Sequence, residues 1–220
     1  MITPELLPRA VLWRAGDGWR MLASTVLGGG LGTRSWVLNA QVDSGYARMD
    51  PDQHLRELAE SAGLTGTGVG MLTAADVSRY RLCSDGGVDV LATVAVGYPT
   101  WAAAPEEAPT SAPGTINLII AVPAALSDAA LVNAVATATE AKVQALLEAG
   151  YACTGTASDA ICVASRIDGP PAEFGGPRSV WGARLARAVH AAVLAGASTP
   201  RSGHRTLRTD ATEHGYADEL

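Results

Sequence analysis

The chain has 220 residues, of which 48% are hydrophobic, 17% are charged and 5% are aromatic, and its formal net charge is −6. This length and apolar fraction suit one domain with its own core, and the negative charge argues against a nucleic-acid partner. The three cysteines, Cys83, Cys153 and Cys162, form no CxxC pair and are odd in number. We therefore expect a reducing compartment, with neither a zinc site nor a disulfide framework.

The beginning of the chain is not typical of a signal peptide. Its first 16 residues, MITPELLPRAVLWRAG, contain Glu5 and two prolines where a signal peptide has an unbroken apolar run. The longest strongly apolar run, 116–126, contains Pro123 and is too short to span a bilayer. We expect a cytoplasmic protein that has no membrane partner. The sequence indicates no particular oligomeric state.

The first half of the chain predicts two strands, over 19–26 and 36–42, on either side of the glycine-rich segment GGGLGT (28–33). This segment lacks the GK[ST] of a P-loop and the third glycine of GxGxxG, so a tight turn is expected there. A helix follows, with Asp50 as its N-cap and Pro51 at its first position. Its apolar stripe consists of Leu55, Leu58, Ala59 and Ala62, and Gly63 ends it.

The middle of the chain alternates between short elements and one long loop. Thr73 and Asp76 have capping-box spacing, which predicts a short helix after Thr73. Alternation over 88–96 predicts a strand with one buried face. The Pro-, Ala- and Glu-rich stretch 98–113 predicts a loop, and TINLIIAV (115–122) is apolar on both faces, as a central strand is.

In the last third, Ser127 is expected to cap a long helix that ends at Gly150. Strands are expected over 151–156 and 160–167, joined by a turn at 157–159. Ser179 is expected to cap a last helix through about Leu194. The segment 197–220 is polar, has no periodicity and is expected to be a disordered tail behind a domain of residues 1–196. The fold class expected is α/β or α+β, a single domain with a mixed sheet packed with helices.

The long helix carries the first candidate site residues. At 100° per residue, one apolar stripe has Thr139 near its middle, with Glu140 and Lys142 at opposite edges. The stripe consists of Val132, Val135, Ala136, Thr139, Val143, Leu146 and Leu147. Residues two apart do not face each other on a helix, so Glu140 and Lys142 are not expected to pair. Either they are charges that flank a core stripe, or each finds a partner elsewhere.

Two further groups of polar residues stand out. The turn TGTASD brings Thr154, Thr156 and Asp159 together with Ser158, where they either bind local backbone N–H groups or line a pocket. Asn39 and Asn117 lie on strands that are otherwise apolar, and a buried amide needs partners. They are therefore either part of a hydrogen-bonding site or two satisfied core amides. The residues alone predict a domain with a polar, hydroxyl-rich pocket.

Six segments in chain order carry a resemblance to a known family. They are STVLGGGLGTRSWVLNAQV, YARMDP, VGMLTAADV, PGTINLII, LVNAVATATEAKVQALLEAGYACTGTASDAICVA and FGGPRSVWGARLARAVHAAV. Together they resemble the adenosylcobinamide amidohydrolase family over about residues 20–195. The segment AVGYPTWAAAP is the loosest match, since the family tends to place an amide or imidazole side chain near Tyr98.

The resemblance implies hydrolysis of one amide of adenosylcobinamide, which gives adenosylcobyric acid and aminopropanol in cobalamin salvage. The cobalt belongs to the corrinoid substrate, so no cofactor or metal of the protein's own is expected. At positions that match the family, Glu140 is expected to activate water, Asp159 to share that role or deliver a proton, and Lys142 to stabilise the oxyanion or set the protonation of a carboxylate. Substrate would be held by Asn39, Thr73, Thr115, Asn117, Thr139, Thr154 and Thr156.

Two alternatives stay open at this point. Thr115 follows Gly114, and self-cleavage between them would expose a threonine nucleophile. The same polar pocket would also suit a corrinoid-binding protein that does not cleave its ligand.

Overall fold

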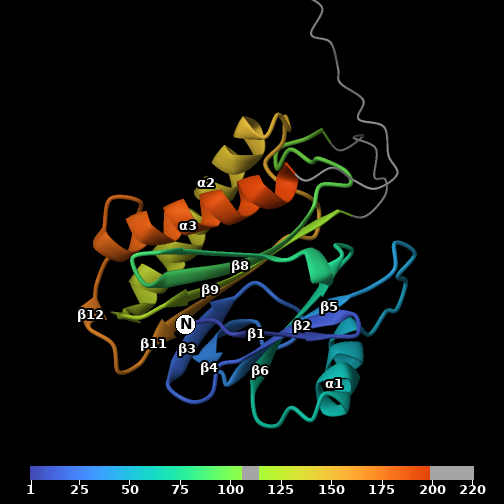
Figure 1. The fold of residues 1–220 in the computed structure, drawn as a ribbon, viewed down its shortest axis with the longest axis horizontal. Coiled ribbons are helices and arrows are strands. Elements are labelled where there is room, and N and C mark those ends of the chain that lie inside the picture. Colours follow the sequence, from blue (N-terminus) through green and yellow to red (C-terminus); the bar gives the residue numbers. More distant parts are fainter. Residues whose placement is uncertain (106–113, 199–220) are drawn as a thin grey trace, which may run out of the picture.

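The computed structural model describes residues 1–105 and 114–198 (Figure 1). The larger of its two main sheets has six strands, in the order β4-β3-β11-β9-β8-β7, and the smaller has four, in the order β1-β2-β5-β6. Strand β9 runs parallel to β11 and antiparallel to β8, and β5 runs parallel to β6 within an otherwise antiparallel sheet. The expected class, mixed sheets packed with helices, is therefore confirmed.

The six-stranded sheet consists of β3 (Trp19–Ala23), β4 (Gly30–Thr33), β7 (Arg81–Asp85), β8 (Val88–Ala95), β9 (Thr115–Val122) and β11 (Ala160–Arg166). The four-stranded sheet consists of β1 (Pro4–Leu7), β2 (Ala10–Arg14), β5 (Trp36–Gln41) and β6 (Gly68–Thr73). A short parallel pair joins β10 (Ala125–Leu126) to β12 (Pro171–Ala172). The helices are α1 (Pro51–Ser61), α2 (Asp128–Glu148), α3 (Val180–Ala197) and the 3₁₀ turn η1 (Val77–Arg79).

These elements stack in four layers (Figure 1). Helices α2 and α3 cover one face of the six-stranded sheet, where Leu118 and Ile120 of β9 pack against them. The other face of that sheet packs against the four-stranded sheet through residues such as Ile119. Helix α1 covers the outer face of the four-stranded sheet with Leu55 and Ala59. All eight residues of β9 are buried, which confirms the expectation of a central strand.

Helix α2 begins after Ser127 as expected, with the Ser127 side chain accepting a hydrogen bond from the Ala130 N–H, but the face it buries differs from the predicted stripe. Its buried residues are Ala130, Leu131, Ala134, Thr137, Ala138, Ala141, Lys142, Ala145 and Leu146. Val132 and Leu147 of the predicted stripe are 62% and 49% exposed. Apolar residues occur on both faces of α2, and the face rich in alanine is the one that fits closely between α3 and the sheet. The predicted stripe was therefore wrong.

Other boundaries were corrected by tertiary pairing. GLGT forms the edge strand β4 against β3, although a glycine turn was predicted there. Residues 151–156 form no strand, and Gly155 makes only an isolated bridge to Thr100, so the predicted hairpin was wrong. Strand β8 is buried on both faces over residues 88–93, not on one. Thr73 ends β6, and Asp76 alone caps η1 by accepting the Ser78 N–H.

The helix ends agree more closely with the sequence. Pro51 starts α1 after Asp50, but the Asp50 carboxylate binds Arg48 instead of capping the helix. Ser179 caps α3 by accepting the Gly182 N–H, and α3 continues to Ala197. Most of the predicted tail, residues 199–220, and the predicted loop residues 106–113 lie outside the described part of the chain. In that described part, no helix is long and apolar enough to cross a membrane.

Candidate functional site

A group of polar residues gathers where β9 and β11 begin, at the right-hand end of these strands in Figure 1. We call Gly114, Thr115, Lys142, Thr156, Ser158 and Asp159 the polar cluster. Helix α2 contributes Lys142, the start of β9 contributes Thr115, and the turn before β11 contributes the last three. Parallel pairing of β9 with β11 brings these segments together.

The centre of the polar cluster is a buried ion pair. Lys142 Nζ lies 2.5 Å from Asp159 Oδ2, and the two side chains are only 8% and 10% exposed. Because burial removes both charges from water, the ion pair is stable only if further hydrogen bonds satisfy the remaining polar atoms of the two side chains. Lys142 thus has a partner on another element, as the sequence allowed.

The Asp159 carboxylate is surrounded by donors. Its Oδ1 accepts the Ile116 N–H at 2.8 Å, and its Oδ2 accepts the Thr156 N–H at 3.1 Å as well as Lys142 Nζ. The Thr156 hydroxyl lies 2.5 Å from Oδ1. These contacts occupy the lone-pair directions of the carboxylate. Asp159 therefore orients Lys142 and the backbone of the TGTASD turn.

Thr115, Ser158 and Thr156 surround one backbone carbonyl. The Thr156 and Ser158 hydroxyls lie 2.7 and 3.0 Å from the Gly114 carbonyl oxygen, and Ser158 Oγ lies 2.9 Å from Thr115 Oγ1. Thr156 has a single hydroxyl proton, so it donates either to Gly114 or to Asp159 at one time. Ser158 was not among the predicted site residues, although its position between Thr156 and Asp159 in the TGTASD turn would have indicated it.

Gly155 leaves room for the ion pair. A Cβ at this position would lie 2.3 Å from Asp159 Oδ2 and 2.6 Å from Lys142 Nζ. Any side chain would therefore displace the charged atoms, which explains a glycine between two threonines of the turn.

Thr154 connects the polar cluster to the loop that follows β8. Its hydroxyl accepts the Ala102 N–H at 2.8 Å and lies 3.2 Å from the Thr100 carbonyl oxygen, to which it donates. The backbone of Thr100 also binds Thr154 and Gly155. The polar atoms of Thr154 are thus used within the protein, and they hold the described part of this loop beside the cluster.

Asn39 and Asn117 bind each other between the two sheets. Asn117 Nδ2 donates to Asn39 Oδ1 and to the Leu72 carbonyl, both at 2.9 Å, and Asn39 Nδ2 donates to Thr93 Oγ1 at 2.9 Å. Both amides are fully buried. Asn117 Oδ1 is a buried oxygen without a hydrogen-bond partner among the described residues. Thr73 lies near this network, and its Oγ1 accepts the Ala75 N–H.

Glu140 and Thr139 lie apart from the polar cluster. Both are exposed, and the Thr139 hydroxyl donates to the Val135 carbonyl of its own helix. Glu140 lines a surface cavity between α2 and α3 together with Gln144 and His190. Glu140 was expected at the edge of a core stripe, but most of that stripe faces outward.

The cysteines near the site are poor nucleophiles. Cys153 is buried next to the turn, and its burial raises the pKa of its thiol above the usual range. Burial also raises the pKa of Cys162 to about 12. Since the thiolate is the reactive form, these thiols stay protonated at neutral pH, and hydroxyl groups are the better candidates. Over the described ranges, no group of three or more His, Cys, Asp or Glu has the arrangement of a metal site.

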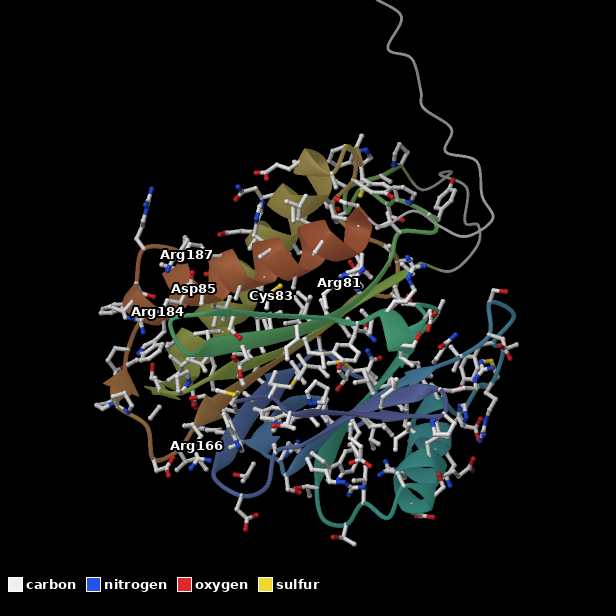
Figure 2. All side chains as sticks on the ribbon, viewed as in Figure 1. Arg81, Cys83, Asp85, Arg166, Arg184 and Arg187 are labelled. Atoms are coloured by element: carbon white, nitrogen blue, oxygen red, sulfur yellow. The ribbon has the colours of Figure 1, made fainter. Side chains whose placement is uncertain are left out.

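A surface cavity opens at the same end of the sheets. Ala75, which follows β6, Ala95, which pairs with Thr115, and Tyr151, which follows α2, line it together with Asp76 and Arg81. Figure 2 shows Arg81 below the end of α3, whereas Asp85, Arg184 and Arg187 lie toward its beginning. There, Arg187 binds both oxygens of Asp85, at 2.7 and 2.8 Å, and so fastens β7 to α3. The cavity gives the polar end of the molecule a concave surface.

Comparison with known proteins gives one consistent result. The sequence profile described as adenosylcobinamide amidohydrolase matches residues 4–204. A protein of Methanosarcina mazei with that name is 32% identical over 182 residues, which cover 79% of this chain and 88% of the relative. A protein of Halobacterium salinarum with the same name is 39% identical over 134 residues, 57% of this chain and 56% of the relative. The chain therefore belongs to the adenosylcobinamide amidohydrolase family.

Proposed function

We propose that this protein hydrolyses the amide that links aminopropanol to the corrinoid in adenosylcobinamide. The products are adenosylcobyric acid and aminopropanol, and the reaction serves cobalamin salvage in the cytoplasm. Membership of the family supports the reaction class. The observation that carries the proposal is the buried Lys142–Asp159 ion pair beside three hydroxyl groups, at one end of the sheets.

Hydrolysis of an amide requires a nucleophile, donors that stabilise the oxyanion, and a proton for the leaving amine. Two hydroxyls, those of Thr156 and Ser158, lie within hydrogen-bond distance of one carbonyl oxygen, which is the kind of arrangement that stabilises an oxyanion. The Lys142 ammonium group adds positive charge and a source of protons. Asp159 keeps this ammonium group and the turn in place.

Glu140 remains the other candidate for activating water. Glu140 is exposed on a different face of α2 from Lys142. The described residues that line the cavity with Glu140 do not include a member of the polar cluster. We therefore assign the reaction to the polar cluster. Glu140 serves as the control carboxylate for experiments on Asp159.

The polar composition of the site suits a corrinoid, which carries many peripheral amides. Threonine and serine hydroxyls both donate and accept hydrogen bonds, so they pair with amides without introducing a further charge. Thr156 and Ser158 are the cluster hydroxyls best placed for this purpose, because Thr156 is half-buried and Ser158 exposed, whereas Thr115 is buried. Thr154 holds the loop after β8 beside the cluster. The described contacts of Asn39, Asn117 and Thr73 lie within the sheets and the turn after β6, so we propose no direct contact between these three residues and the reacting amide. The cobalt is part of the substrate, and we propose no cofactor of the protein's own.

The experiment is incubation of the purified chain with adenosylcobinamide, followed by chromatography for the corrinoid acid and for aminopropanol. Formation of both products in equal amounts supports the proposal. Tight binding of adenosylcobinamide without any acid product would instead identify a corrinoid-binding protein and would refute the hydrolase.

A further inference from the structure

The peptide bond between Gly114 and Thr115 lies inside the polar cluster. Its carbonyl oxygen, that of Gly114, is 2.7 Å from the Thr156 hydroxyl and 3.0 Å from the Ser158 hydroxyl. These donors come from positions 42 and 44 residues further along the chain. With the Thr156 proton directed to Gly114 instead of Asp159, two convergent hydroxyls on one carbonyl oxygen stabilise the negative charge that forms there when the carbonyl carbon is attacked.

The nucleophile for such an attack is part of the same bond. The Thr115 side chain is only 3% exposed, and its Oγ1 lies 2.9 Å from Ser158 Oγ, which also contacts the Gly114 carbonyl. Ser158 therefore connects the hydroxyl group of Thr115 with the oxygen of the preceding carbonyl. A threonine hydroxyl reaches its own preceding carbonyl carbon through rotation of one side-chain bond.

Gly114 is required for this close approach. A Cβ at Gly114 would lie 2.7 Å from the Ala95 carbonyl oxygen and 2.7 Å from the Gly97 nitrogen. A side chain would therefore push the carbonyl out of the reach of the two hydroxyls. The fold thus holds this particular peptide group between the end of β8 and the turn before β11.

We propose that the chain cleaves itself between Gly114 and Thr115, and that Thr115 then serves as the nucleophile of the amidohydrolase. In the first step, Thr115 Oγ1 bonds to the Gly114 carbonyl carbon and gives its proton to Ser158 Oγ, 2.9 Å away, which passes a proton on to the Thr115 nitrogen. The C–N bond to Thr115 breaks as the nitrogen takes up this proton, so an ester and a free amine result. In the second step, water adds to the ester and yields the Gly114 carboxylate, the Thr115 hydroxyl and a new N-terminus.

Cleavage prepares the site for an external amide. The Thr156 and Ser158 hydroxyls lose their bonds to the Gly114 carbonyl and become free for the carbonyl of a substrate. The new amine of Thr115 lies next to its own Oγ1 and serves as the base that activates it, as in other N-terminal threonine nucleophiles. The role in substrate cleavage rests on the function proposed above, whereas the self-cleavage stands on the cluster geometry alone.

The test compares the intact mass of four purified full-length chains: wild type, Thr115→Ala, Thr115→Ser and the control Thr67→Ala. Thr67 is an exposed threonine whose hydroxyl donates to the Thr33 carbonyl, outside the polar cluster. The expected result is that wild type, Thr115→Ser and Thr67→Ala each yield two fragments that remain associated. One fragment ends at Gly114 and the other begins at residue 115, while Thr115→Ala stays at about the 22.5 kDa of the full chain.

A wild-type chain that hydrolyses adenosylcobinamide at an undivided 22.5 kDa would overturn the inference and leave the proposed function intact. Cleavage of Thr115→Ala at the same bond would also overturn it, since a contaminating protease would then be responsible. Conversely, a divided chain that leaves adenosylcobinamide unchanged would support self-cleavage and refute the proposed function. If Thr115→Ala fails to fold, as judged by circular dichroism, Thr115→Val gives the second readout, because valine has nearly the shape of threonine but no hydroxyl. Cleavage of Thr115→Val at the wild-type rate would overturn a role for this hydroxyl.

Discussion

Lys142 on α2 and Asp159 before β11 form an ion pair of 2.5 Å that is almost fully buried. The pair joins the helical layer to the start of the central strands, because Asp159 also accepts the Ile116 N–H of β9. Burial of two charges is costly, and it is repaid only where hydrogen bonds satisfy the remaining polar atoms. The turn TGTASD provides these bonds through the backbone and side chain of Thr156.

The first prediction concerns stability. Asp159→Asn leaves the Lys142 charge buried without a counter-ion, so the free energy of unfolding should fall by about 3 kcal/mol, the usual scale for breaking a buried pair. Urea denaturation followed by circular dichroism measures this change. Asp43→Asn is the matched control, since Asp43 is 84% exposed and pairs with Arg9 at the surface, where ion pairs contribute little. Equal unfolding midpoints for the two variants would contradict the account.

Gly155 provides a second prediction. Gly155→Ala places a Cβ within 2.3 Å of Asp159 Oδ2, so the ion pair has to separate or the turn has to move. We expect a loss of stability of about 2 kcal/mol, within the range of strained core substitutions, together with a loss of activity. Gly45→Ala is the control, because a Cβ there meets no atom within 4 Å. A Gly155→Ala variant with the wild-type melting temperature and turnover would argue that the pair is looser than described.

The buried amides should behave as a unit. Asn117→Ala leaves Asn39 Oδ1 without the Asn117 donor, and Asn39→Ala removes one of the two acceptors of Asn117 Nδ2. Each single change should cost about 1–3 kcal/mol of stability, because a buried polar atom loses its partner. The double variant should cost clearly less than the sum of the two, which a double-mutant cycle in urea measures. Strict additivity would show that the two side chains do not depend on each other.

The cysteines allow a prediction about reactivity. Burial raises the pKa of the Cys153 thiol, so very little thiolate is present at neutral pH. Treatment of the native protein with iodoacetamide at pH 7 should therefore leave Cys153 unmodified and the activity unchanged, as mass spectrometry of its peptides would show. Because the shift is upward, alkylation should increase only as the pH rises above the ordinary thiol range. Rapid alkylation of Cys153 at pH 7 with loss of activity would point to a thiol in the mechanism.

Much of the architecture follows from sequence patterns. The apolar run at 115–122 predicted the central strand β9, and Ser127, Pro51 and Ser179 marked the starts of three helices. The strands β1, β2, β6 and β7 were not predicted, since they are short and their side chains do not alternate clearly. The wrong face of α2 has a different cause. Helix α2 has apolar residues on all sides, so the sequence does not show which side is buried. The side rich in alanine packs against the rest of the protein because alanine allows a closer approach than valine.

The site was only partly predictable for a related reason. Lys142, Asp159, Thr115 and Thr156 were expected at the site, and the structure brings them together. The contacts that join α2, the start of β9 and the turn before β11 span 17 to 44 positions of sequence, so no local pattern reveals them. A strand was expected over 151–156, but the hydroxyls of Thr154 and Thr156 bind the Thr100 loop, the Gly114 carbonyl and Asp159. Asn39 and Asn117 did need partners, and each is the partner of the other.

The most direct test of the polar cluster compares turnover of adenosylcobinamide by Thr156→Val, Asp159→Asn and Glu140→Gln, each first shown to be folded by circular dichroism. Thr156→Val removes only the hydroxyl of the cluster, and Glu140→Gln removes a carboxylate that is exposed on another face of α2. We predict that kcat falls by about 10²-fold or more for Thr156→Val, the scale of one lost oxyanion donor, with KM changed far less. For Asp159→Asn, kcat should also fall, because Lys142 and the turn lose the carboxylate that orients them. Glu140→Gln should keep kcat within about 3-fold of wild type, since groups outside the reacting centre contribute little to the transition state. A loss of kcat in Glu140→Gln with near wild-type turnover in Thr156→Val and Asp159→Asn would contradict the account and place the chemistry on the outer face of α2.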